Sequence, residues 1–276
     1  MPRTRALAAA LRKEIEASGM GVRRIADILG LSHTTISQWQ NGTRVPSSEN
    51  VAALLAVLRV TGDRREDIMD LARASTDPNW LAPRSAVRLR PIHELERAAT
   101  EVIAWAPLLI SGLLQTEEYA RAIVDCDRTA KPDEITTRVQ LRTARLAALT
   151  RDRNPPANVV ILLGESAFGQ VFGGHDVMIT QLYRIIEEIK GSTTTTRIVP
   201  FGTGWHPGLN GPFLMYNFDQ MPSIVFRESY RRSTFLYDKD DVADYQDAAV
   251  EVRSLALSQH ESAAFVANIV RRFETA

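Results

Sequence analysis

The N-terminal fold is decided by the stretch Val22 to Gly42, which reads VRRIADILGLSHTTISQWQNG. Apolar residues recur in it at helical spacing: Val22, Ile25, Ala26 and Leu29. Gly30 follows, and glycine accepts the positive φ that a sharp helix exit requires. Ser32 can cap another helix, because its hydroxyl can accept from exposed backbone N–H groups. The stretch therefore predicts a short helix, a tight turn and a second short helix.

The second helix has two chemically distinct faces. Ile36 and Trp39 are expected to point inward, and a polar, nearly uncharged set is left outside: His33, Thr34, Thr35, Ser37 and Gln38. Such side chains suit hydrogen bonding to base edges, and helix-turn-helix proteins place this helix in the major groove. We predict that these five residues contact bases, with Gln38 best suited to pair bidentately with adenine. The alternative is a helical hairpin in an ordinary bundle.

Basic residues flank this helix. Residues 1–59 hold eight basic and four acidic side chains, a net charge of +4 in a chain whose formal net charge is zero. That asymmetry is typical of a modular DNA-binding protein. The residues predicted to contact phosphates are Arg23, Arg24, Asn41 and Arg44. For each arginine the alternative is a solvated surface charge.

The same stretch resembles the DNA-binding domain of the phage-repressor or xenobiotic-response-element (XRE) family. In that resemblance Gly30 is the turn glycine, Ser32 opens the recognition helix, and the Asn41-Gly42 pair ends it. It implies an all-α unit of five helices over residues 4–75. Gly21 and Val22 depart from the polar cap and Gln that the family often has there.

Composition limits the class of protein. A chain of 276 residues with 45% hydrophobic and 24% charged residues is long enough for two folded domains. The sequence has no apolar run long enough to span a bilayer, and residues 1–10 lack a signal-peptide core. The single cysteine, Cys126, excludes an internal disulfide. We expect a cytoplasmic protein without membrane attachment.

Residues 76–91 carry three prolines and no periodicity, which predicts a linker. Residues 92–276 alternate helical and strand patterns, which predicts a mixed α/β domain. The expected helices are Ile92–Trp105, one beginning after Thr116, Asp133–Thr150, Val177–Lys190, Asp240–Leu257, and one capped by Ser258 and Glu261. The expected strands are Asn158–Leu163, Thr195–Pro200, Phe213–Phe218 and Ser223–Arg227. The first two strands and the helix between them form a possible βαβ unit.

A second resemblance covers most of residues 92–270. The runs Gly112 to Thr116, Tyr119 to Ala122 and Arg142 to Leu149 are similar to a C-terminal domain fused to this helix-turn-helix type in regulators of high-GC bacteria. That resemblance implies an antitoxin-like regulator that acts with a small protein encoded by a neighbouring gene. From the residues alone, the apolar segment Leu108–Leu114 is either core or a partner groove.

The sequence lacks the motifs that are typical of catalysis and cofactor binding. Ser166 follows a predicted strand, but Phe168 stands where a nucleophile elbow needs glycine. The glycines from Gly169 to Gly174 are wrongly spaced for a dinucleotide loop, and the five histidines lack the pairing of a zinc site. We therefore expect no enzyme, cofactor or metal.

The sequence thus predicts a sequence-specific transcriptional regulator that binds a double-stranded DNA operator. A single recognition helix reads few base pairs, so a homodimer on two half-sites is expected. We expect residues 92–276 to be the regulatory domain, which serves dimerisation and binds the protein partner. The alternative is a one-component sensor whose C-terminal domain binds a small-molecule effector.

Overall fold

The computed structural model describes residues 2–76, 79–82, 89–126, 132–191, 193–229 and 233–275. The chain forms two compact units, Met1–Ala82 and Pro83–Ala276. Much of the predicted 76–91 linker lies outside the described residues. Within the described ranges, every helix is too short or too polar to cross a membrane.

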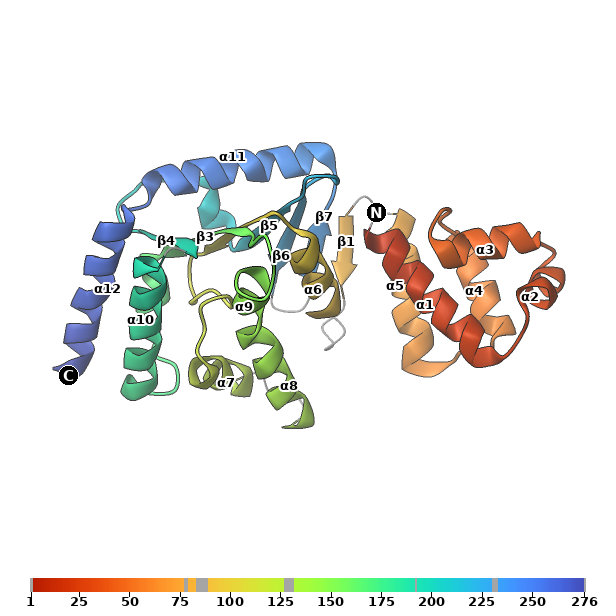
Figure 1. The fold of residues 1–276 in the computed structure, drawn as a ribbon, viewed down its shortest axis with the longest axis horizontal. Helices are drawn as coiled ribbons and strands as arrows, with labels where there is room; N and C mark the ends of the chain where they lie inside the picture. The colour runs from red at the N-terminus through yellow and green to blue at the C-terminus, as the bar shows by residue number, and fades with distance from the viewer. Residues whose placement is uncertain are drawn as a thin grey trace. The chain divides into compact units, whose positions relative to one another are not determined.

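The first unit contains the five expected helices (Figure 1). They are α1 Pro2–Ser18, α2 Val22–Leu29, α3 His33–Asn41, α4 Ser48–Val57 and α5 Gly62–Thr76, followed by a short strand, β1 Asn79–Ala82. Each helix contributes at least one fully buried side chain to a common core: Leu11, Ile25, Ile36, Leu54 and Ile68. The helical periodicity of the sequence therefore closes one apolar core, which holds α2 and α3 in place.

The second unit is built on a mixed sheet, and this confirms the predicted α/β class. Its strands are β2 Glu101–Ala106, β3 Asn158–Gly164, β4 Thr194–Val199, β5 Phe213–Asn217, β6 Ile224–Glu228 and β7 Ser233–Leu236. They lie in the order β7-β6-β5-β2-β3-β4. Strands β2, β3 and β4 are parallel, whereas β5, β6 and β7 are antiparallel to their neighbours.

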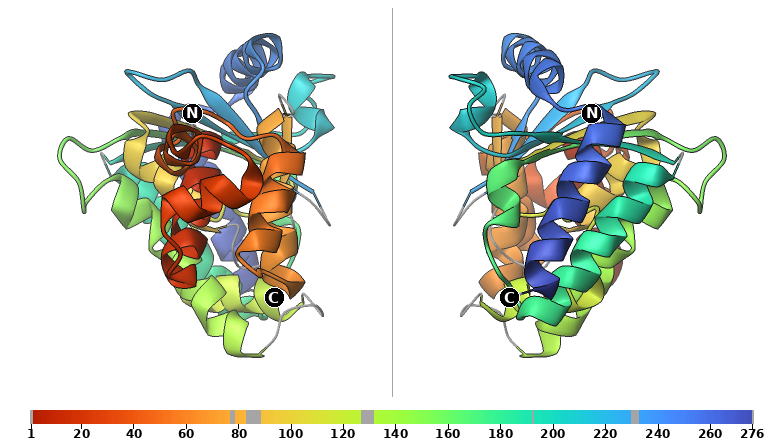
Figure 2. Two further views of the ribbon diagram at one scale, coloured as in Figure 1. Left: turned by 90° about the vertical axis from the view of Figure 1, so that its right-hand side faces the viewer. Right: turned by 90° about the vertical axis from the view of Figure 1, so that its left-hand side faces the viewer.

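Helices cover both faces of this sheet. They are α6 Leu89–Ala98, α7 Glu117–Asp125, α8 Pro132–Thr143, α9 Arg145–Leu149, α10 His175–Lys190, α11 Lys239–Leu255 and α12 Gln259–Glu274. Helix α11 lies across one face, while α9, α10 and α12 lie on the other (Figures 1 and 2). Between the sheet and α11 lies an apolar cluster of buried residues, which includes Trp105, Leu162, Met215 and Val252.

The predicted βαβ unit is confirmed: β3 and β4 are parallel and α10 connects them. The outer side of β4 is closed by the junction of α11 and α12. There the Ile198 N–H donates to Ser262 Oγ at 3.0 Å and the Leu257 N–H donates to the Ile198 carbonyl at 2.8 Å. The capping box of Ser258 and Glu261 predicted at the start of α12 is also present. The open edge of β4 is therefore hydrogen-bonded within the chain at Ile198.

Two predictions for the second unit were wrong in part. The expected helix Ile92–Trp105 ends at Ala98, and the chain continues as β2, the strand between β3 and β5. A strand buried on both faces is a nearly continuous apolar run, which periodicity cannot distinguish from a buried helix. The helix expected over Asp133–Thr150 is divided at Ala144 into α8 and α9, and strand β7 was not anticipated.

Candidate nucleic-acid interface

The turn between α2 and α3 has the geometry that its glycine predicts. Gly30 has φ 64°, and its N–H donates to the Asp27 carbonyl at 3.3 Å. The Leu31 N–H donates to the Ala26 carbonyl at 2.9 Å. This pair of hydrogen bonds satisfies two carbonyls in the last turn of α2, and the chain turns sharply into the next helix.

Helix α3 is capped at both ends. At its start Ser32 Oγ accepts from the Thr35 N–H at 3.2 Å and lies 2.9 Å from Thr35 Oγ1. At its end Gly42 has φ 69°, and the Thr43 N–H donates to the Gln38 carbonyl at 3.0 Å. These caps make a nine-residue helix a defined unit, although its length alone would leave it marginal in water.

The two faces of α3 separate as the sequence predicts. Ile36 and Trp39 are buried. His33 and Thr34 are exposed, and three residues are half-buried: Thr35, Ser37 and Gln38. Among the described residues none hydrogen-bonds the Gln38 side-chain amide, whereas the Thr35 hydroxyl is held by the Ser32 cap. The structure thus leaves the Gln38 amide available to a ligand and engages Thr35 within the helix.

The basic side chains predicted to contact phosphate are accessible. Arg23 and Arg24 lie in the first turn of α2, and Arg44 follows α3. All three are exposed. Among the residues that the structure describes, no carboxylate pairs with any of the three. Cations of this kind are free to neutralise a polyanion.

Arg12 on α1 is a candidate site residue that sequence reasoning missed. Its Nη2 donates to the Gln40 carbonyl at 2.8 Å and to Asn41 Oδ1 at 3.3 Å. Arg12 therefore joins α1 to the last turn of α3, and it orients the Asn41 side chain. Contacts between residues 28 positions apart carry no periodic signal in the sequence, so only its positive charge could have pointed to it.

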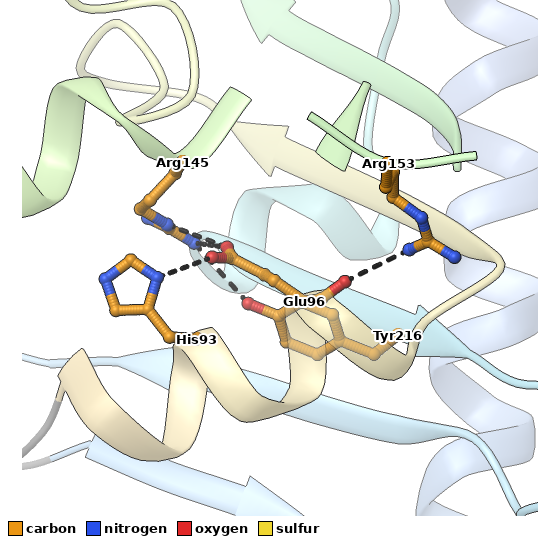
Figure 3. Close-up of polar contacts among 5 residues, drawn as sticks. All are labelled: His93, Glu96, Arg145, Arg153 and Tyr216. Atoms are coloured by element: carbon orange, nitrogen blue, oxygen red, sulfur yellow. Dashed lines mark hydrogen bonds and ion pairs between the residues drawn. The ribbon is translucent and has the colours of Figure 1, made fainter. Parts of the chain in front are cut away.

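The second unit contains a buried polar cluster of its own (Figure 3). Glu96 on α6 accepts a hydrogen bond of 2.7 Å from Nε of Arg145 on α9. Arg145 Nη2 also lies 3.4 Å from the Tyr216 hydroxyl of β5, and His93 Nδ1 lies 3.7 Å from Glu96 Oε2. The cluster ties two helices to the sheet through charge-assisted hydrogen bonds.

Burial and charge act against each other at Arg145. Burial disfavours the charged guanidinium, but the adjacent Glu96 carboxylate more than offsets this and raises the pKa of Arg145. Burial also raises the pKa of the Tyr216 hydroxyl, and Glu96 adds to that increase. Arg145 therefore stays charged and Tyr216 neutral, which suits a structural ion pair rather than acid–base chemistry.

One of the segments that carry the second resemblance, Gly112 to Thr116, lies beside this cluster. Gln115 Nε2 donates to the Ile110 carbonyl at 2.8 Å, and Arg142 Nη1 donates to Gln115 Oε1 at 3.4 Å. A Cβ on Gly112 would lie 3.4 Å from Arg145 Nη1. Thr116 caps α7 by accepting from the Tyr119 N–H at 3.3 Å. Within the described residues, no group of three or more His, Cys, Asp or Glu side chains is placed to hold a metal ion.

Comparison with known families assigns both units. Residues 6–68 match the model of a helix-turn-helix domain. Together with the fold and the exposed face of α3, this match defines the class of the protein as a DNA-binding regulator of the helix-turn-helix type. Residues 89–268 match the model described as a domain of unknown function, DUF5753. Since that match spans well over half of the chain, the protein belongs to the DUF5753 family. No curated protein and no solved structure matches the chain.

Proposed function

We propose that this protein is a sequence-specific transcriptional regulator of the XRE type, which binds a double-stranded operator as a homodimer. The observation that carries the proposal is the outer face of α3. It offers the Gln38 amide and small hydroxyls to a ligand, and free cations lie in the neighbouring turns. Base contacts of this kind specify sequence, and phosphate contacts position the helix on the duplex.

In the proposed complex His33, Thr34, Ser37 and Gln38 read base edges. Thr35 offers its methyl group, because its hydroxyl is held by Ser32, the cap of α3. The second set of residues positions the helix by holding phosphates: Arg23, Arg24, Asn41 and Arg44. This division of labour requires that the two sets respond differently to mutation.

The test is a duplex-library enrichment followed by gel-shift titration of the winning site over a range of salt. Gln38→Ala should relax preference at one base pair, with a discrimination loss of ~1–3 kcal/mol there. Arg44→Ala should weaken binding to all duplexes alike and flatten the log–log salt slope by about 0.9. Arg253→Ala, an exposed arginine on α11, is the matched control and should do neither. Identical effects of Gln38→Ala and Arg44→Ala on every duplex would contradict the assignment.

We further propose that the regulator acts with a small protein encoded beside it, in the manner of an antitoxin. The support is the resemblance of residues 92–270 to regulators of that kind. Co-expression with the neighbouring gene and affinity capture of the tagged chain tests this, and failure of the two products to co-purify would contradict it.

A further inference from the structure

Five large apolar side chains of the second unit face solvent on two loops. We call them the apolar edge: Leu108, Leu109, Phe201, Trp205 and Leu209. Their exposed fractions are 62%, 41%, 68%, 74% and 60%. Single exposed leucines are ordinary on a protein surface, but an exposed tryptophan beside an exposed phenylalanine on one loop calls for an explanation.

The topology gathers these side chains at one end of the sheet. Since β2 and β4 are parallel to β3, the segments that follow these strands leave the sheet at the same end. Gly164, at the end of β3, lies so close to Pro107 that a Cβ would come within 2.7 Å of the Pro107 carbonyl oxygen. Glu165 then accepts from the Phe201 N–H at 2.7 Å. The chain at Pro107 is therefore tied through β3 to the loop that carries Phe201.

The second loop is held in one conformation. Gly202 and Gly204 have φ of 82° and 79°, a region that glycine adopts at little cost. Trp105 Nε1 donates to the Gly208 carbonyl at 2.7 Å, and the Trp105 and His206 rings meet edge to face. A Cβ on Gly208 would lie 2.7 Å from a methyl of Val252, so this turn packs tightly on α11. The exposed aromatic rings are thus presented by a braced loop, which lowers the entropy cost of binding.

The apolar edge carries no formal charge. A quarter of the chain is charged, at 24%, but residues 107–116 and 200–213 contain no Asp, Glu, Lys or Arg. In a two-fold interface each patch meets its own copy, so any charge near the axis would face a like charge. An uncharged patch avoids that repulsion and also avoids the desolvation of ion pairs. The composition of this surface therefore suits self-association.

The area is also of the right order. From their exposed fractions, the five side chains present on the order of 500 Å² of apolar surface. A stable interface buries about 800 Å² on each partner. Backbone and polar atoms of the same two loops can supply the remainder as the rim.

We propose that the apolar edge is the surface on which a second copy of this chain docks, with Trp205 and Leu209 as its central anchors. This inference rests on the homodimer in the proposed function and names the surface that forms it. The two copies bury the same side chains against each other across a two-fold axis.

The test is sedimentation velocity of the full chain from 0.5 to about 50 μM. The wild type should sediment as a dimer, and Trp205→Ser/Leu209→Ser should raise the dimer dissociation constant at least about 100-fold, because tryptophan anchors dominate interface energies. Leu108→Ser, on the other loop, should raise it by about tenfold. The control is Val250→Ser, which removes an apolar side chain that is 70% exposed on α11, and it should leave the dimer intact. Far-ultraviolet circular dichroism establishes that each variant is folded.

A wild type that stays monomeric at 50 μM would overturn the inference. So would a dimer dissociation constant that is unchanged in Trp205→Ser/Leu209→Ser and in Leu108→Ser, or one that Val250→Ser raises equally. Dimerisation only when the neighbouring gene product is added would assign the surface to that partner instead. Gel shifts distinguish failure of the proposed dimer surface from failure of the proposed DNA-binding function. The monomeric edge variant should keep weak binding to a single half-site and lose cooperativity on paired half-sites. A wild-type dimer that selects no duplex would refute the DNA-binding proposal and leave the dimer surface standing.

Discussion

Gln38 and Trp39 are neighbours in the chain and have opposite environments. Trp39 is 2% exposed in the core of the first unit, and the Gln38 amide remains without a partner among the described residues. One helical step of about 100° separates them, which is enough to divide packing from recognition. The sequence predicted the environments of these two residues correctly, because burial along a helix follows its periodicity directly.

Arg12 shows what periodicity does not convey. Arg12→Ala should reduce operator affinity by about three- to tenfold, because Asn41 loses the hydrogen bond that orients it and the last turn of α3 loses an anchor. Lys13→Ala removes the same charge from the adjacent, exposed position and should cost less than Arg12→Ala. Fluorescence anisotropy at fixed salt measures both, and equal losses would reduce the role of Arg12 to its charge.

The Glu96–Arg145 pair gives a second prediction for single residues. Arg145→Met should lower the free energy of unfolding of the second unit by ~3–5 kcal/mol, because the Glu96 carboxylate is left buried without its partner. Glu96→Leu combined with Arg145→Met should be less damaging than Arg145→Met alone. Arg151→Met removes a 59% exposed partner of Glu188 and should cost less than ~1 kcal/mol. Urea denaturation measures all three, and additive losses in the double variant would contradict this account.

At the scale of elements, the α2–turn–α3 unit depends on backbone conformation at one position. Gly30→Ala should lower the free energy of unfolding of the first unit by ~1–2 kcal/mol, because φ 64° is strained for a residue with a Cβ. A Cβ would meet nothing within 4 Å at either Gly30 or Gly21, and Gly21 has φ −66°. Gly21→Ala should therefore cost less than Gly30→Ala, because its only expected penalty is the weaker N-cap of α2. Thermal denaturation by circular dichroism distinguishes the pair, and equal effects would show that φ is not the cause.

The elements also show where sequence reasoning stops. The amphipathic helices of the first unit, the βαβ unit and the Ser258–Glu261 cap were predicted from local patterns and are confirmed. Strand β2 was not, because Val102 to Trp105 is apolar in a way that fits a buried helix as well as a buried strand. Its pairing with both β3 and β5 decides the matter, and that pairing joins residues more than 50 positions apart.

For the whole molecule, the two units have separate cores and should unfold as separate cooperative steps. Trp39 reports on the first unit and Trp105 on the second, since both are buried. Fluorine NMR of protein labelled with fluorinated tryptophan can follow the two signals separately in urea. Gly30→Ala should lower only the urea midpoint reported by Trp39, and Arg145→Met should lower only the midpoint reported by Trp105. Parallel shifts of both signals in both variants would show that the units unfold together.

The sequence by itself determined the helices of the first unit, the polar outer face of α3 and the mixed α/β class of the second unit, because each follows from local spacing, caps and turn residues. Only the tertiary structure decided that Arg12 reaches the end of α3, that Glu96 and Arg145 pair, and that Leu108 and Trp205 face solvent at the same end of the sheet. These features join distant parts of the chain, and their energy depends on packing and desolvation that no local pattern records.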